Sequence, residues 1–279
     1  MNSAAASTAP ASTGKAGRNL PVAIGVGVGL GAIAVAALYI VPWGWLLLVI
    51  PAICVGIGEL ARGFAAGGFH VPVVPVMIGA VGMHVGAYLG GAPGLMLGLG
   101  LTLFAVVCWR SVLGIDRAAR DVTAGVFVAA YAPFLSAFST LMLLDPNGAS
   151  RIAVFIIVTI CSDIGGYAAG VMAGRHPMAP TVSPKKSWEG FAGSAAACLV
   201  AGMIAVPLML GGPVWAGALL GAATVLLATL GDLTESMLKR DLGIKDLGAL
   251  LPGHGGLMDR MDSLLVTAPG AWIILTLFV

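Results

Sequence analysis

The polar residues that follow an apolar run near position 230 are spaced as one face of a helix. Four of them recur at i, i+3, i+4 and i+7, namely Asp232, Glu235, Ser236 and Lys239. If the helix continues through Arg240, all four lie on the same side of it. They suit a metal–phosphate site, because Mg²⁺ commonly takes one or two carboxylates together with water and phosphate oxygens. A solvated helix end with i, i+4 ion pairs is the alternative, and this segment alone leaves both open.

A second acidic cluster begins the last predicted helix, in the sequence GGLMDRMDSLL. Asp259, Asp262 and Ser263 again have i, i+3, i+4 spacing, with Arg260 between the two carboxylates. Acidic residues near a helix N-terminus are stabilised by the helix dipole, so capping is one interpretation. Capping needs only one carboxylate, however, and two on one face beside an arginine favour phosphate or metal binding.

The segment LPGHGG lies directly before this helix. Glycine allows backbone N–H groups to approach a phosphate closely, although the sequence contains no GxxxxGK[ST] motif. His254 lies between Gly253 and Gly255. It fits a general base, a phosphate donor or a turn residue, and a structural or positioning role is the favoured interpretation.

Two further segments place charge beside or inside apolar runs. The sequence SPKKSWEG at 183–190 sets Lys185 and Lys186 next to Trp188. A membrane-interface anchor explains the tryptophan, whereas two ammonium groups at headgroup depth suit a lipid phosphate or a triphosphate. Asp163 lies within an apolar run, where a carboxylate is costly and marks a candidate functional site. Structural pairing with a buried basic residue is the alternative for Asp163.

The composition shows which elements must position these residues. The chain has 279 residues, of which 59% are hydrophobic and only 9% charged, with a mean hydropathy of +1.01. A soluble domain carries about 25% charged residues, so this chain lacks the polar surface that water requires. We therefore expect an all-α polytopic membrane protein. The four cysteines show no metal-binding spacing and are expected to be buried, reduced side chains.

Nine apolar runs are long enough to be membrane helices. Placing the N-terminus in the cytoplasm puts thirteen of the fourteen Lys and Arg residues on that side and only Arg151 outside, as the positive-inside rule expects. The sequence thus predicts nine spans with the C-terminus outside, a disordered tail at 1–20, and a single transmembrane catalytic domain at 21–279. The runs are 21–41, 43–60, 71–90, 92–109, 122–144, 152–174, 190–211, 213–231 and 263–279.

The predicted cytoplasmic loops are longer than the outside loops, and two stand out, at 175–189 and 232–262. The second holds six of the twelve acidic residues of the chain. We therefore expect the chemistry to lie there, with the site-bearing part of the domain spanning roughly 160–263.

Together these motifs resemble the signature of the phosphatidate cytidylyltransferases, also called CDP-diacylglycerol synthases. The stretch SMLKRDLGIKDLGALLPGHGGLMDRMD at 236–262 matches the family pattern S-x-x-[apolar]-K-R, then K-D, then P-G-H-G-G-[apolar]-x-D-R-x-D at every position. SPKKSWEG at 183–190 and GDLTES at 231–236 are similar to two other family blocks. SDIGGYAAG at 162–170 resembles a third block more loosely, and the N-terminal half is recognisable only as hydrophobic spans.

The resemblance implies transfer of a cytidylyl group from CTP to phosphatidate by a homodimer in the bacterial cytoplasmic (inner) membrane. It implies Mg²⁺ held by Asp232 and Asp259, and leaves a second metal such as K⁺ open. CTP, phosphatidate and membrane lipids are the expected partners, and nucleic acid is not. The implied catalytic residues are Asp163, Lys239, Asp246, His254 and Asp262, and the implied phosphate-binding residues are Ser183, Lys185, Lys186, Ser236, Arg240, Lys245 and Arg260.

A transporter and another Mg²⁺-dependent membrane transferase, such as a prenyltransferase, are the alternative functions. Asp163 and the glycine-broken helices fit a substrate path, but the chain shows no internal repeat and its polar residues cluster on one side. Aspartate-rich loops fit a prenyltransferase, which leaves the PGHGG and SPKK segments unexplained. Only the cytidylyltransferase hypothesis requires CTP.

Overall fold

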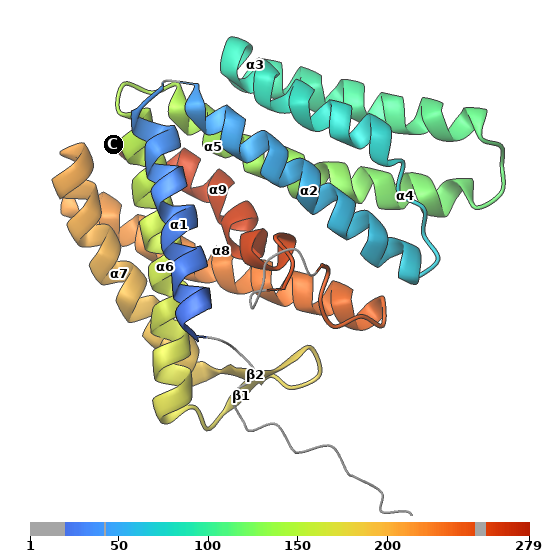
Figure 1. The fold of residues 1–279 in the computed structure, drawn as a ribbon. Coiled ribbons are helices and arrows are strands. Elements are labelled where there is room, and N and C mark those ends of the chain that lie inside the picture. The colour runs from blue at the N-terminus through green and yellow to red at the C-terminus, as the bar shows by residue number, and fades with distance from the viewer. Residues whose placement is uncertain (1–19, 42, 249–254) are drawn as a thin grey trace, which may run out of the picture.

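The computed structural model describes residues 20–41, 43–248 and 255–279. Apart from one short β-hairpin, the elements in this part of the chain are helices (Figure 1). The helices are α1 Leu20–Tyr39, α2 Gly44–Ala66, α3 Val73–Val112, α4 Ala118–Ala129, the π-helix η1 Ala130–Phe134, α5 Leu135–Leu143, α6 Gly148–Ala173, α7 Trp188–Leu210, α8 Val214–Asp241 and α9 Met258–Phe278. Most of the predicted N-terminal tail, and His254, lie outside the described residues.

α9 is the central helix of the bundle. Figure 1 shows it between a group formed by α2, α3, α4 and α5 and a second group formed by α6, α7 and α8. It packs against α8, α5, α6 and α2, while α6 packs on α7 and α7 on α8. Because the acidic start of α9 lies in the interior, residues from both groups can reach it.

The expectation of an all-α polytopic membrane protein is confirmed in its main features. Within the described residues, seven helical segments are long and apolar enough to cross a membrane: α2, α3, the continuous α4–η1–α5 segment, and each helix from α6 to α9. α3 is interrupted at Gly91, where φ is 60° and ψ is −149°. Its two arms pack closely, since a Cβ on Gly86 would lie 2.6 Å from the Gly94 carbonyl oxygen.

The predicted loop at 175–189 folds into a β-hairpin, which the all-α expectation did not include. β1 (Pro177–Ala179) pairs antiparallel with β2 (Ser183–Ser187). Ser187 ends β2 and also begins α7, because its Oγ accepts a hydrogen bond from the Gly190 N–H at 3.1 Å. Strands this short carry no recognisable alternation of apolar and polar residues, so no sequence period marks them.

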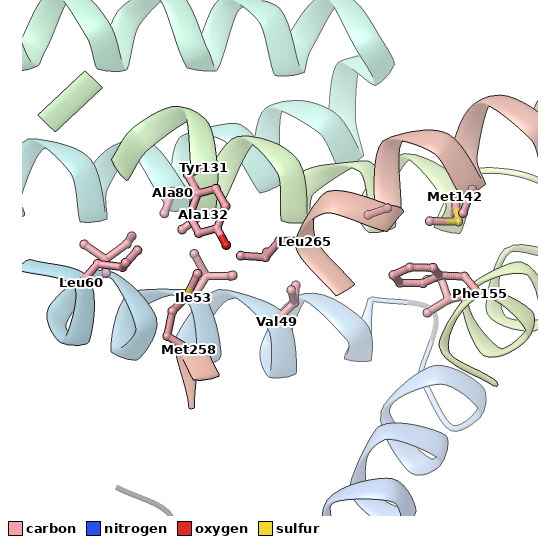
Figure 2. Close-up of a cluster of buried hydrophobic side chains, with 14 of the residues drawn as sticks. Val49, Ile53, Leu60, Ala80, Tyr131, Ala132, Met142, Phe155, Met258 and Leu265 are labelled. Atoms are coloured by element: carbon pink, nitrogen blue, oxygen red, sulfur yellow. The ribbon is translucent and has the colours of Figure 1, made fainter. Parts of the chain in front are cut away.

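A large apolar cluster lies where α2 meets α9 and the π-helix. Figure 2 shows apolar side chains from these elements, with others from α3, α5 and α6. In a membrane such a cluster stabilises the fold by close packing, since lipid tails are as apolar as the side chains themselves. The labelled members are Val49, Ile53, Leu60, Ala80, Tyr131, Ala132, Met142, Phe155, Met258 and Leu265.

The buried histidine of α3 is held by hydroxyl groups of α5. His84 is 0% exposed, and its Nδ1 and Nε2 lie 2.7 Å from Thr140 Oγ1 and 3.0 Å from Ser136 Oγ. Ser136 donates its own hydroxyl hydrogen to the Pro133 carbonyl, so it accepts from Nε2–H. Both ring nitrogens of His84 therefore have hydrogen-bond partners inside the bundle.

Glycines set the close contacts between α6, α7 and α8. A Cβ on Gly165 of α6 would lie 2.6 Å from the Gly193 carbonyl oxygen of α7, and a Cβ on Gly193 would lie equally near the Gly165 oxygen. The glycines beside Asp163 therefore allow α6 and α7 to pack closely. Between α7 and α8, a Cβ on Gly217 would overlap the Gly202 carbonyl oxygen.

We expect Gly217→Ala to destabilise the bundle by about 1–3 kcal/mol, because the added methyl group forces α7 and α8 apart. Gly82→Ala is the matched control, since Gly82 is also a helical glycine but a Cβ there would meet nothing within 4 Å. Thermal unfolding of both detergent-solubilised variants checks this. Equal stability of Gly217→Ala and wild type would contradict the proposed close crossing.

Candidate active site

A cavity of about 350 Å³ lies at the end of the bundle that carries the β-hairpin. Its walls come from α6, both strands of the hairpin, α7, α8 and α9. The two segments that the sequence singled out, 183–190 and 232–262, therefore meet in space, and the segment around Asp163 joins them. Seven predicted site residues line the cavity: Asp163, Lys185, Lys186, Asp232, Asp259, Arg260 and Asp262.

Asp163 marks how far the cavity reaches into the bundle. It lies ten residue steps before Ala173, the last residue of α6, which corresponds to about 15 Å of helix rise. The neighbouring wall of α7 is polar, because Ser194 lines the cavity and donates its hydroxyl to the Ser162 carbonyl at 2.7 Å. A carboxylate at this depth is thus reached through a polar cavity, as expected for a functional intramembrane acid.

The hairpin and α8 are joined by an ion pair inside the cavity. Lys186 Nζ contacts Asp232 Oδ2, and the two side chains are 22% and 41% exposed. The hairpin keeps this geometry because Glu189, in the first turn of α7, accepts hydrogen bonds from the backbone N–H groups of Arg175 and His176. Glu189 thus has a structural role in the SPKKSWEG segment.

A second ion-pair cluster joins α8 to α9. Lys239 Nζ lies 2.8 Å from Asp259 Oδ1 and 3.3 Å from Glu235 Oε2. Glu235 and Lys239 are the i, i+4 pair on the predicted polar face of α8, which continues to Asp241. Lys239 is not among the cavity-lining residues, so it acts on the cavity in this arrangement through Asp259.

Asp259 also binds backbone N–H groups of described residues on either side of 249–254. Its Oδ2 accepts hydrogen bonds from the Gly256 N–H at 3.0 Å and from the Leu247 N–H at 3.2 Å. Gly256 must approach closely, because a Cβ there would lie 2.7 Å from Asp259 Oδ2. One carboxylate therefore positions Lys239, both ends of the loop and part of the cavity wall.

The other predicted site residues that the structure describes do not line the cavity. Ser183 pairs with Ala179 in the hairpin, and Arg240 Nε is 3.5 Å from the Val182 carbonyl oxygen, which brings it beside the hairpin. Lys245 and Asp246 are exposed in the loop after α8. Ser236 is half-buried on α8, and His254 is outside the described residues. The roles assigned to them stay predictions.

The charges of the cavity indicate how a polyanionic ligand could be held. Among the described residues, four carboxylates (Asp163, Asp232, Asp259 and Asp262) and three cationic side chains (Lys185, Lys186 and Arg260) line it. The formal sum is −1, so a triphosphate and a lipid phosphate need additional positive charge there.

No three acidic, histidine or cysteine side chains in the described ranges form a metal-binding group by themselves. The carboxylates fit Mg²⁺, which takes only one or two of them and completes its shell with water and phosphate.

Several lining residues were missed by sequence reasoning. Tyr167 and Gly170 belong to the segment around Asp163, while Ser194, Phe191 and Thr229 come from α7 and α8. Thr229 precedes Asp232 by one helical turn, so the periodicity that selected Asp232 could have included it. Glu59 of α2 does not line the cavity, but it is fully buried beside the start of α9. It was missed although it is an acidic residue in an apolar run, as Asp163 is.

Comparison with known proteins shows the family of this chain. The sequence profile of the Cytidylyltransferase family matches residues 21–278. A phosphatidate cytidylyltransferase of Mycobacterium bovis is 42% identical over 279 aligned residues, covering 95% of this chain and 91% of the relative. Proteins of the same name from Mycobacterium tuberculosis and Mycobacterium leprae are 42% and 41% identical, again over 95% of this chain, and are themselves covered to 85% and 90%. The chain therefore belongs to the cytidylyltransferase family.

Proposed function

We propose that this protein transfers a cytidylyl group from CTP to phosphatidate, forming CDP-diacylglycerol and pyrophosphate for phospholipid synthesis. The observation that carries the proposal is the single cavity in which the SPKK hairpin, Asp163 and the acidic start of α9 converge. The mycobacterial relatives bear the name of this activity. A cavity at the end of a membrane bundle also suits one substrate from water and one from the bilayer.

The reaction requires little proton transfer. A phosphate oxygen of phosphatidate attacks the α-phosphorus of CTP, the new P–O bond forms, and the bond to the bridging oxygen of the β-phosphate breaks. The electron pair leaves with pyrophosphate. The second pKa of a phosphomonoester is about 6, so the nucleophile is largely ionised at neutral pH.

The principal difficulty is to bring two polyanions together, and the cationic side chains address it. We propose that Lys186 and Arg260, which reach the cavity from β2 and α9, each bind substrate phosphate. Lys186 would exchange its contact with Asp232 for a phosphate oxygen. Fixed cations aligned on the substrates stabilise the charge that develops during an in-line displacement.

We propose Asp232 and Asp259 as the carboxylates that hold Mg²⁺. When bound, the ion would neutralise phosphate charge and orient the leaving group. The support is the pair of carboxylates from α8 and α9 in one cavity whose formal charge is −1. Lys239 contacts Asp259 Oδ1 and keeps that carboxylate oriented.

We further propose nine spans in the bacterial inner membrane, with the N-terminus cytoplasmic, the C-terminus outside, and two copies forming a homodimer. The number of nine spans is supported by the helices. The seven apolar segments become eight when the two arms of α3 are counted separately, and α1 is the ninth. This topology puts the cavity on the cytoplasmic side, where CTP is made available.

The topology predicts that a cysteine at position 147, in the short loop before α6, reacts with a membrane-impermeant thiol reagent from outside. The measurement uses Asn147→Cys in a chain whose four native cysteines are replaced. Thr181→Cys, in the turn of the β-hairpin, is the opposite-side control. Labelling of position 147 only from the cytoplasmic side would contradict the orientation.

Asp259→Asn should lower turnover by about 10²-fold or more, because the carboxamide lacks the charge that orients Lys239 and holds Mg²⁺. Formation of CDP-diacylglycerol from phosphatidate, CTP and Mg²⁺ by purified protein is the measurement. Asp241→Asn, at the exposed end of α8, is the matched control and should keep full activity. Wild-type turnover by folded Asp259→Asn protein would refute the metal role. A folded wild type that makes no product would refute the proposed function.

Lys186→Ala should raise the apparent KM for at least one substrate by about tenfold, because a charge-assisted hydrogen bond to phosphate contributes about 1.5–3 kcal/mol. Arg62→Ala removes an exposed cation of α2 and should leave both KM values unchanged. Initial rates measured while each substrate is varied separately decide the point. Unchanged KM values for both CTP and phosphatidate would count against a phosphate contact.

A further inference from the structure

Glu59 is a fully buried carboxylate that lies against the start of α9. It belongs to α2, its side chain is 0% exposed, and its Oε2 accepts a hydrogen bond from the Met258 N–H at 2.8 Å. Its Oε1 has no hydrogen-bond partner in the described part of the chain. Burying a carboxylate in an apolar bundle costs free energy, so the presence of Glu59 beside the candidate active site requires an explanation.

The start of α9 needs an acceptor that its own sequence does not supply. The first N–H groups of a helix have no partner within the helix. Leu257 occupies the N-cap position, and its side chain makes no capping hydrogen bond. Glu59 provides the missing acceptor from another helix, and its negative charge also lies at the favourable end of the α9 dipole.

Glu59 also determines how closely the loop before α9 can pack. A Cβ on Gly248 would overlap Glu59 Oε1, and the three heavy atoms nearest to that Cβ all belong to the Glu59 side chain. A Cβ on Gly256 would lie 2.8 Å from Glu59 Oε2 and 2.8 Å from the Gly248 nitrogen. The two glycines, one at each end of the loop, therefore enclose this carboxylate at distances that only glycine permits.

Glu59 and Asp259 hold adjoining backbone groups of the same segment. Glu59 binds the N–H of Met258, and Asp259 binds those of Gly256 and Leu247. Movement of Met258 would displace Asp259, which is the next residue and contacts Lys239. We propose that Glu59 is a positioning residue for the start of α9. It caps α9 from α2 and packs against Gly248 and Gly256. It thereby fixes the first turn of α9, which presents Asp259, Arg260 and Asp262 to the cavity.

The first test measures backbone protection and needs no activity. In Glu59→Ala, amide hydrogen exchange in a peptide covering 255–262 should be faster by about tenfold or more, because the Met258 N–H loses its acceptor. Asp121→Asn is the control. Asp121 is another buried carboxylate, and it lies on α4 away from the cavity. It accepts a hydrogen bond from the backbone N–H of His70. It should leave exchange in 255–262 unchanged.

The second test is kinetic and rests on the proposed function. Glu59→Ala should lower kcat for CDP-diacylglycerol formation by about 10²-fold, because small displacements of positioned groups are that costly. Glu59→Gln should retain more activity, because its amide oxygen still accepts from Met258. Gly248→Ala should also be impaired, since its methyl group meets Glu59. The double variant Glu59→Ala/Gly248→Ala should match Glu59→Ala within about twofold, because the clash no longer exists.

The outcomes separate the two proposals. Normal protection of 255–262 in Glu59→Ala, or equal loosening in Asp121→Asn, would overturn the positioning role. The positioning role would also be overturned if the kcat losses of Glu59→Ala and Gly248→Ala added fully in the double variant. A wild-type protein without cytidylyltransferase activity would refute the proposed function, while the exchange measurement would still decide the role of Glu59.

Discussion

The ion pair between Lys239 and Asp259 joins α8 to α9, and the rest of the candidate site is arranged around it. Opposite charges 2.8 Å apart in a partly buried setting attract each other strongly. Separating them would leave a charge in an apolar bundle, which is costly. This constraint fixes the start of α9 relative to the polar face of α8. Asp259 then has oxygens available for the backbone of the preceding loop, so one pair orders both a helix contact and a loop.

Charged and polar side chains elsewhere in the bundle also need partners within the protein. Lys186 is paired with Asp232, and Glu59 lies against the N-terminus of α9. His84, farther along the bundle, has a hydroxyl partner at each ring nitrogen. Because lipid offers no hydrogen bonds, buried polar groups have to find partners within the protein. The partners come from different helices, so satisfying these groups also specifies how the helices are arranged.

The location of the cavity follows from the substrates that the proposed reaction combines. A nucleotide cannot enter the hydrocarbon region, and a diacyl lipid does not leave it. The cavity lies at one end of the bundle and has exposed Tyr167 and half-buried Phe191 among its lining residues, together with the charged groups. Glycines at the α6–α7 contact keep the helices close behind it. The bundle thus provides a polar surface without a separate soluble domain.

Much of this protein could be predicted from its sequence. Apolar runs of about 20 residues predict membrane helices, because a helix satisfies its own backbone hydrogen bonds in lipid. The spacing of Asp232, Glu235 and Lys239 places them on one helix face, and the structure agrees, since α8 continues to Asp241. The contiguous 236–262 signature indicated the family, which the relatives confirm. These features are local, so they can be read along the chain.

Only the tertiary structure decided which separated residues meet. The contact of Lys186 with Asp232, the hairpin that presents it, and the capping of α9 by Glu59 join segments far apart in the sequence. Glu59 could have been noticed as an acid in an apolar run, yet its partner could not have been named. The physical reason is that helical periodicity gives the direction of a side chain from its own helix, whereas its neighbour depends on how the helices pack.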